Sequence, residues 1–522
     1  MTEIALGFAT LLHPTVLGFL LIGIVAGLIV GAIPGLNDNI AFAIFIPLSF
    51  SLSPTYAFAL MVGLYCSAAV GGSIPAIMVK VPGTASAVLT AIDGHAMARN
   101  GFAGRALGIA ITSSVFGGFS SALILLFFAP PMAAFALRFG YVENFSLGIL
   151  GMASVIGLLG GSIIKGLLSA VLGLLVATIG FSLQTGYPRY TFGIDNLYEG
   201  VPFVPLLVGL FGITAVLELS EELIRDRRKG VASPDMPRIT DSLFIGWPLA
   251  KRLLPTWLQC SLLGNVIGVI PGAGMLMAIY MGYERISHRY QRLFAGKPGE
   301  PEWGQGAPEG IAAPESANNA VVASSMVPLL SLGIPGNSVS ALFIGAMMIQ
   351  GMVPGPLLFI DHADIAWMII VAFLVANVLM WPIAYALVRT ISGMVFRLPK
   401  YVLVPTISLL CLTGAYSDEN SVFSIGVAIA SGIVGYATRR LGIPHAPLIL
   451  ALVLGRTIED NLSNALNIGG GNWLIFLDPA EHPISVALMA GAALFIVGPL
   501  LSGARRRFQA QRRAAELELE NG

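Results

Sequence analysis

Apolar runs of membrane-crossing length recur along the whole chain, and they limit its fold more than any other feature. They occupy residues 16–33, 107–137, 148–182, 365–388 and 484–502. Each run is long enough for a helix that crosses a hydrocarbon core, which takes about 20 residues. The runs are continuous rather than alternating, which disfavours a β-barrel. The sequence therefore predicts an all-α polytopic membrane protein with about 10–12 transmembrane segments, some of them half-helices or re-entrant.

The composition agrees with that class. Hydrophobic residues make up 56% of the chain and charged residues only 11%, whereas soluble domains carry about 25% charged residues. The 28 basic and 28 acidic side chains cancel, so we expect no nucleic acid as a partner. The three cysteines show no CxxC spacing, so we expect neither a metal site nor a disulfide framework.

Lys and Arg gather in three stretches, which the positive-inside rule places in the cytoplasm. These are residues 221–252, residues 284–300 and the C-terminal tail. The stretches around 361–364 and 456–483 are poor in Lys and Arg, and we expect them outside. The resulting division is a first transmembrane repeat at 8–220, a basic cytoplasmic linker at 221–252, a second repeat at 253–480, a C-terminal transmembrane helix at 481–503 and a basic cytoplasmic tail at 504–522.

Two Pro-Gly motifs occur in the same order in both halves of the chain. The first contains Pro34-Gly35 in one half and Pro271-Gly272 in the other; the second contains Pro82-Gly83 and Pro335-Gly336. The loop charges that follow equivalent motifs are opposite, which predicts inverted-topology repeats with discontinuous helices at the motifs. Pro removes an amide donor and Gly allows the chain to leave the helix, so we expect a hinge or break at each motif.

Polar side chains gather next to these breaks. Helix breaks free backbone amides that attract anions and carbonyls that can bind Na⁺. Small hydroxyl and amide side chains can add hydrogen bonds to a carboxylate, although capping of a helix explains any one of them equally well. We expect the substrate-binding residues to be Ser73, Thr84, Ser86, Asn318, Asn319, Asn337, Ser338 and Lys80. Lys80 either neutralises an anionic substrate or extends to the membrane interface.

Two carboxylates lie within this otherwise apolar sequence. Asp38, flanked by Asn37 and Asn39, follows the first break, and Glu315 precedes the amides of the second half by three and four residues. A carboxylate within the membrane is costly unless it is paired or functional. We expect these four residues to bind a coupling cation; Asp38 could instead carry a proton, and Asp38 and Glu315 could instead cap helices.

At these motifs the chain resembles the large membrane subunit of the tripartite tricarboxylate transporters, the TctA family. The resemblance rests on Gly31–Leu36, Gly71–Gly83, Ala91–Gly108, Tyr190–Gly193 with Gly209–Gly212, and above all Gly304–Phe359. Similar proteins usually carry a neutral residue in place of Lys80 and fewer acidic residues around Asp38. The substrate and the coupling ion can therefore differ from those of the citrate type.

The resemblance implies a permease of the bacterial inner membrane with two protein partners. One is a small membrane subunit of about four helices, and the other is a periplasmic solute-binding protein that delivers an organic carboxylate. Uptake would be driven by an ion gradient, with Na⁺ the usual ion and H⁺ the alternative. No GxxxxGK[ST] motif for ATP occurs in the chain. We expect a secondary transporter rather than an enzyme; a membrane-embedded enzyme and a passive anion channel remain the alternatives.

Overall fold

The computed structural model describes residues 2–33, 36–49, 51–158, 162–182, 184–229, 239–272, 274–395 and 400–498. The chain forms two compact units, one made of Met1–Leu137 with Val201–Leu441 and the other of Arg138–Gly200 with Gly442–Gly522. Each unit takes residues from both sides of the predicted linker. The boundaries of the predicted repeats therefore stay a prediction, and the predicted tail 504–522 lies outside the described residues.

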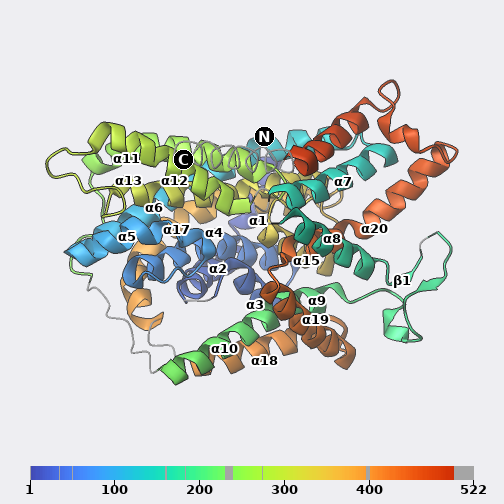
Figure 1. The fold of residues 1–522 in the computed structure, drawn as a ribbon, viewed down its shortest axis with the longest axis horizontal. Helices are drawn as coiled ribbons and strands as arrows, with labels where there is room; N and C mark the ends of the chain where they lie inside the picture. Colours follow the sequence, from blue (N-terminus) through green and yellow to red (C-terminus); the bar gives the residue numbers. More distant parts are fainter. Residues whose placement is uncertain are drawn as a thin grey trace, which may run out of the picture. The chain divides into compact units, whose positions relative to one another are not determined.

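The first unit is built from helices that run through both halves of the chain (Figure 1). Its first half contains α1 (Thr2–Leu11), α2 (Pro14–Ala32), α3 (Asp38–Ser49), α4 (Pro54–Val79), η1 (Ala85–Ala87), α5 (Thr90–Met97), η2 (Ala98–Phe102) and α6 (Ala103–Ala136). The chain returns to it with α9 (Phe203–Val208), η4 (Gly209–Ile213) and α10 (Thr214–Lys229). The second half adds α11 (Trp247–Val269), α12 (Gly274–Phe294), α13 (Pro308–Ser324), α14 (Met326–Leu332), α15 (Ser338–Ile349), α16 (Leu358–Asp361), α17 (Ala363–Val395), α18 (Lys400–Glu419) and α19 (Val422–Arg440).

The second unit is smaller. It contains α7 (Tyr141–Leu158), α8 (Ile163–Ala177), the two-stranded antiparallel pair β1 (Gly180–Phe181) and β2 (Pro188–Arg189), η3 (Asp195–Leu197), α20 (His445–Ile468) and η5 (Trp473–Leu477). Helix α20 packs against α7 and α8. An apolar helix, Pro483–Gly498, lies within the predicted C-terminal transmembrane segment.

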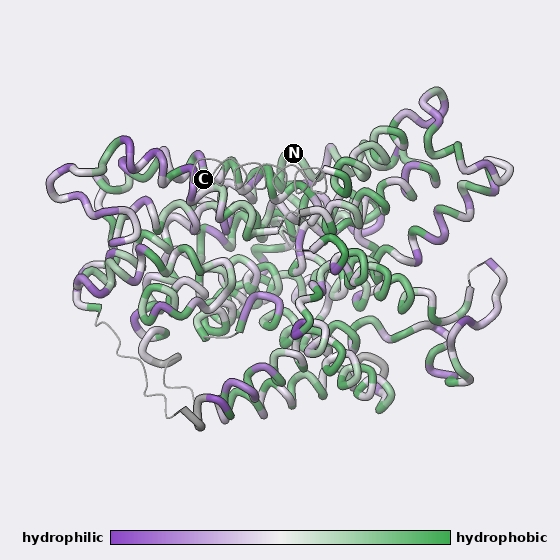
Figure 2. Tube along the Cα trace, in the orientation of Figure 1, coloured by the Kyte–Doolittle hydropathy of each residue, from purple (hydrophilic) through white to green (hydrophobic). Residues whose placement is uncertain are grey.

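The helical content and hydropathy confirm an all-α polytopic membrane protein. Among the described residues, six helices are long and apolar enough to cross a membrane, and shorter apolar helices accompany them. Figure 2 shows hydrophobic residues over most of the helices, whereas α10 carries many hydrophilic ones. In α4, the whole membrane-length window is buried inside the protein, so this helix meets other helices rather than lipid.

The internal repeat appears as two copies of the same helix packing. In the first half α2 packs on α4, and Gly27 lies so close to α4 that an added Cβ would be 2.6 Å from the Leu64 carbonyl oxygen. In the second half α11 packs on α13, and a Cβ on Gly264 would lie 2.5 Å from the Ala317 carbonyl oxygen. Glycine is required at both contacts because any side chain would force the backbones apart.

The described motifs interrupt helices in matching ways. Helices α2 and α11 both end just before a Pro-Gly pair, with extended backbone at Ile33 and Ile270. Helices α4 and α14 both end in a left-handed residue, Lys80 (φ 58°) and Gly333 (φ 71°). The structure thus confirms discontinuous helices, with Pro82-Gly83, Pro271-Gly272 and Pro335-Gly336 in the connections; Pro34 and Gly35 lie outside the described residues.

Contacts between α4 and α13 show that the halves are inverted. Tyr65, in the middle of α4, lies beside Ser325 at the end of α13, with 3.2 Å between the hydroxyl oxygens. The chain after α4 folds back so that Thr84 touches Gly72. Ser86 in this segment contacts Asn318, which lies about two turns before Ser325 at 3.6 residues per turn. Toward its C-terminus α4 therefore meets progressively earlier residues of α13, so these two equivalent helices cross antiparallel, as an inverted repeat requires.

Candidate functional site

The two equivalent long helices cross deep inside the first unit, and polar side chains gather on both sides of the crossing. All seventeen residues of α13 are buried, although the helix contains carboxylates and amides. On one side, the Tyr65 hydroxyl accepts a hydrogen bond from Asn337 Nδ2 (2.7 Å). Asn337 Oδ1 accepts from the Ser340 backbone N–H (2.9 Å) and closes a capping box at the start of α15. The Tyr65 hydroxyl and the Asn337 amide therefore both have partners within the protein.

The other side contains polar atoms without partners. Asn318 Nδ2 donates to Ser86 Oγ (3.2 Å), and the Thr84 and Ser86 hydroxyls lie 2.7 Å apart. Asn318 Oδ1 and both amide atoms of Asn319 have no hydrogen-bond partner, although each residue is only 1% exposed. Buried amides without partners are costly and rare in native proteins, so these atoms make Asn318 and Asn319 the candidate residues for a polar ligand.

Glu315 lies on the same helix and is tied to the first half. Thr90 Oγ1 and Ser114 Oγ each donate to one of its carboxylate oxygens, both at 2.6 Å. The residue is 1% exposed. Both oxygens of Glu315 thus have protein partners, and the side chain fastens α13 to α5 and α6.

Asp38 differs from Glu315 because it has a free oxygen. It is 6% exposed, and its Oδ1 has no hydrogen-bond partner. The neighbouring Asn39 also has an unpartnered, buried Oδ1. Asn37 instead caps α3, since its Oδ1 accepts from the Ile40 N–H (3.1 Å). The free oxygens of Asp38 and Asn39 are suitable ligands for a hard cation.

Three other predicted site residues lie elsewhere. Lys80 is exposed and occupies the left-handed position that ends α4, in contrast to the buried residues of the crossing. Ser73 is fully buried, but its hydroxyl donates to the Val70 carbonyl of its own helix (2.7 Å). Ser338 is half-buried in the first turn of α15. The hydrogen bonds therefore join Thr84, Ser86 and Asn318, and Asn319 follows Asn318 on α13.

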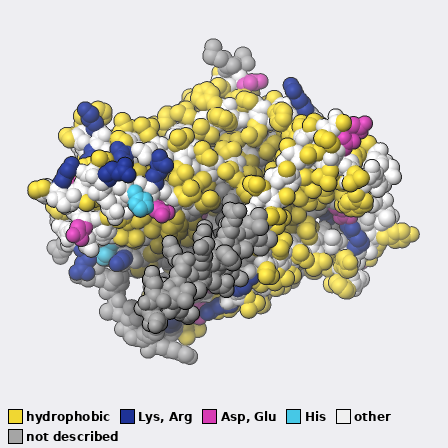
Figure 3. All heavy atoms as spheres, turned by 45° about the horizontal axis from the view of Figure 1, so that its top comes forward, with side chains coloured by type: hydrophobic (Ala, Val, Ile, Leu, Met, Phe, Trp, Pro, Cys, Tyr) yellow, Lys and Arg dark blue, Asp and Glu magenta, His cyan; other side chains and the backbone are white. Residues whose placement is uncertain are grey.

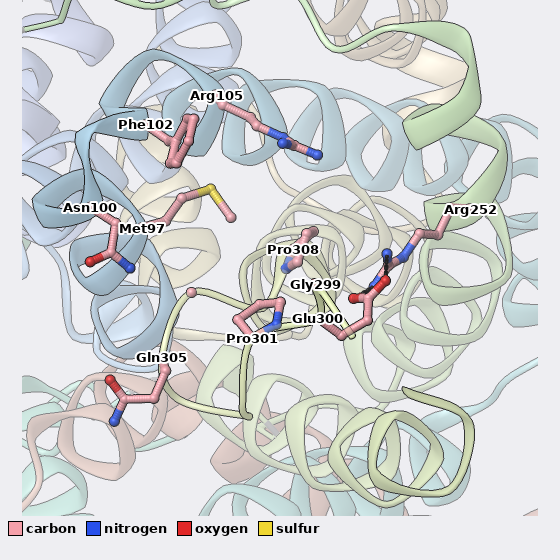
Figure 4. A pocket seen from close by; sticks show the side chains of 11 residues that line it. Met97, Asn100, Phe102, Arg105, Arg252, Gly299, Glu300, Pro301, Gln305 and Pro308 are labelled. Carbon is pink, nitrogen blue, oxygen red and sulfur yellow. Dashed lines mark hydrogen bonds and ion pairs between the residues drawn. The ribbon is translucent and has the colours of Figure 1, made fainter. Parts of the chain in front are cut away.

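A cavity of about 590 Å³ opens near the start of α13 (Figure 4). Arg105 and Arg252 enter it from different helices, and Arg252 forms ion pairs with Glu300 (2.7 Å) and Glu309 (2.6 Å). The hydrogen bonds from Arg252 lower the pKa of the Glu300 carboxyl below its usual value. Figure 3 shows Lys and Arg side chains gathered over one region of the surface, surrounded by apolar atoms.

Sequence reasoning missed several side chains that shape this region. Tyr65, Thr90 and Ser114 complete the polar contacts of the crossing, and Asn377 on α17 has a buried, unpartnered Oδ1. A lone amide within the apolar run 365–388 was the available signal for Asn377, because amides are disfavoured on a lipid-facing helix. Asp93 lies within the motif Ala91–Gly108, and its carboxylate accepts a hydrogen bond from a residue more than two hundred positions away in the sequence.

Comparison with known proteins identifies the family. The model of the "Tripartite tricarboxylate transporter TctA family" matches residues 17–450, which include every residue of the crossing. The chain belongs to the TctA family.

Two relatives from Agrobacterium vitis are similar to this TctA-family chain. An uncharacterized 52.8 kDa protein in the TAR-I ttuC' 3' region is 35% identical over 508 residues, which cover 97% of each chain. An uncharacterized protein in the TAR-II ttuC' 3' region is 34% identical over 244 residues, which are 47% of this chain and 96% of that one. No solved structure matches. The family is one of tripartite transporters, so the chain is a subunit of such a transporter.

Proposed function

We propose that the chain is the permease subunit of a secondary active transporter that imports an organic carboxylate, a di- or tricarboxylate or an aromatic acid. The observation that carries this proposal is the set of unpartnered amide atoms on Asn318 and Asn319 at the crossing of two inverted broken helices. Buried polar groups at such a midplane crossing are where secondary transporters bind substrate. Asn319 Nδ2 would donate to a carboxylate oxygen, and the Ser86 and Thr84 hydroxyls would add further hydrogen bonds.

The coupling cation would bind at Asp38 and Asn39. Their free oxygens lie at the start of α3, just beyond the first break, and Na⁺ prefers such oxygen ligands. Glu315 is a weaker candidate because both of its oxygens already accept hydroxyl hydrogen bonds. If the driving ion is H⁺, Asp38 is also the residue that would carry it.

The proposed arrangement places the protein in a bacterial inner membrane with the basic end in the cytoplasm. A small membrane subunit and a periplasmic solute-binding protein would complete the transporter, as the family name "tripartite" implies. Substrate would arrive from the binding protein, occupy the crossing, and leave at the basic end, where the cavity lies.

Uptake by the whole assembly tests the proposal. Proteoliposomes that contain the chain and its small membrane subunit are given the solute-binding protein and a panel of labelled acids that includes citrate. We expect accumulation above the external concentration only when a Na⁺ or H⁺ gradient is imposed. Equilibration without accumulation would indicate a passive channel, and chemical conversion of the acid would indicate a membrane-embedded enzyme.

A further inference from the structure

In each half of the first unit, one side chain forms hydrogen bonds with the segment that precedes the long helix of the other half. Asp93, on α5 of the first half, contacts the loop before α13. Its Oδ1 accepts hydrogen bonds from the backbone N–H groups of Gly304 (2.9 Å), Gly306 (3.1 Å) and Ala307 (2.8 Å). Asp93 is fully buried, so water does not compete for these bonds.

Asp93 holds the loop that leads into α13, because the three N–H groups that it accepts from come just before the first turn of the helix. Ala307 occupies the N-cap position of α13 and has no side chain that could accept a hydrogen bond. A carboxylate near a helix N-terminus also interacts favourably with the helix dipole. The other oxygen, Oδ2, accepts from the Tyr283 hydroxyl (3.1 Å) and lies against Gly310, where an added Cβ would clash with it. Asp93 therefore fixes the start of the helix that carries Asn318.

The second half makes a comparable contact with the first half. Gln350 follows α15, and its Nε2 donates to the Ser49 carbonyl (2.7 Å) and more weakly to the Leu52 carbonyl (3.4 Å). The first carbonyl ends α3 and the second lies in the loop before α4, which begins at Pro54 just as α13 begins at Pro308. This contact is neutral and has fewer bonds than the contact of Asp93.

We propose that Asp93 and Gln350 are positioning residues that act as latches, one at each end of the first unit, and that release of Asp93 opens a path from the cavity to the amides of Asn318 and Asn319. The cavity is lined by Gly306 and Pro308, so the Asp93 contact lies at its wall. From Pro308 to Asn318, α13 extends about 15 Å at 1.5 Å per residue. The role of the latches in substrate passage rests on the proposed transport function. Their effect on access to the buried amides does not depend on it.

Thiol accessibility tests the latches without any substrate. The reporter is Ser86→Cys, a position that is 6% exposed beside Asn318, in a full-length chain whose native cysteines are replaced by alanine. His288→Cys on the exposed part of α12 marks the side of the basic end. A membrane-impermeant thiol reagent is added to one side of proteoliposomes at a time.

We expect Asp93→Ala to increase the labelling rate of the reporter at least tenfold from the side that labels position 288, a change equivalent to about 1.4 kcal/mol in the closing equilibrium. Gln350→Ala should increase labelling from the opposite side, and by less. Tyr283→Phe is the matched control, because it removes one bond to Asp93 and leaves the three backbone bonds; its labelling should stay near the parent rate.

Asp93→Asn is a second variant that keeps the test valid if Asp93→Ala does not fold. Its amide oxygen can still accept the backbone bonds but lacks the charge, so we expect a labelling rate between those of the parent and Asp93→Ala. Monodisperse elution of each variant in detergent shows that it is folded. Folded Asp93 variants that label no faster than the parent, or equally from both sides, would overturn the proposal. Failure of transport with a positive labelling result would instead remove only the proposed function.

Discussion

Replacement of Asn319 by leucine should affect stability and transport in opposite directions. Both amide atoms of Asn319 lack partners in a residue that is 1% exposed. Each buried polar group without a partner costs roughly 1–3 kcal/mol. Asn319→Leu removes both groups and keeps a side chain of similar size, so the substrate-free protein should unfold at the same or a higher temperature. Loss of a hydrogen bond to a charged substrate costs roughly 1.5–3 kcal/mol, or about ten- to more than a hundredfold in affinity.

The matched control is Asn337→Leu. Asn337 lies on the other side of the crossing, but its amide bonds both Tyr65 and the Ser340 N–H. Its loss should lower the unfolding temperature because it removes a helix cap and leaves buried groups unpaired. The assay compares thermal unfolding of both purified variants in detergent with uptake at limiting substrate. The reasoning is refuted if Asn319→Leu is destabilised as much as Asn337→Leu, or if it transports like the parent.

Three further predictions follow from the contacts and charges. Asp38→Asn should raise the Na⁺ concentration for half-maximal uptake with less effect at saturating Na⁺, measured across a Na⁺ series in the complete assembly; an unchanged Na⁺ dependence would exclude Asp38 as a ligand. A cysteine at position 362 should react with an external reagent and one at position 292 should not; the reverse pattern would invert the proposed orientation. Gly264→Leu should destabilise the protein by more than the roughly 1–3 kcal/mol typical of overpacking, because its Cβ would meet the α13 backbone. Gly393 has open space around it, so Gly393→Leu should leave the unfolding temperature unchanged. Equal effects of the two substitutions would argue against the close approach of α11 and α13.

The breaks and the inverted repeat could be predicted from the sequence because their causes are local. A Pro-Gly pair interrupts a helix through its own backbone chemistry, and loop charges report the side of the membrane independently of packing. The amides of Asn318 and Asn319 could also be identified, since two adjacent amides in an apolar membrane segment are costly unless they bind a partner. These inferences required no knowledge of which helices touch.

The placement of Lys80 and Asp93 could not be predicted in that way. Whether Lys80 turns toward the crossing depends on the left-handed turn that ends α4, and the equivalent residue of the other half is Gly333. Asp93 bonds a loop more than two hundred residues away, and no local pattern encodes that pairing. The split between Asp38 and Glu315 has the same origin, because only the fold shows that Thr90 and Ser114 occupy the oxygens of Glu315.

The repeat also explains why one side of the crossing is closed and the other is open. Around the second Pro-Gly motif, positions 253 apart correspond, so Tyr65 matches Asn318 and Gly72 matches Ser325. On the closed side the Ser325 hydroxyl lies beside the Tyr65 hydroxyl. On the open side the matching position is Gly72, which has no hydroxyl to offer, and Asn318 Oδ1 is left without a partner. The two equivalent positions thus differ in their contacts: one is occupied by a hydroxyl pair, and the other leaves an amide oxygen free. The proposed transport function therefore predicts a single bound substrate, on the Asn318 side.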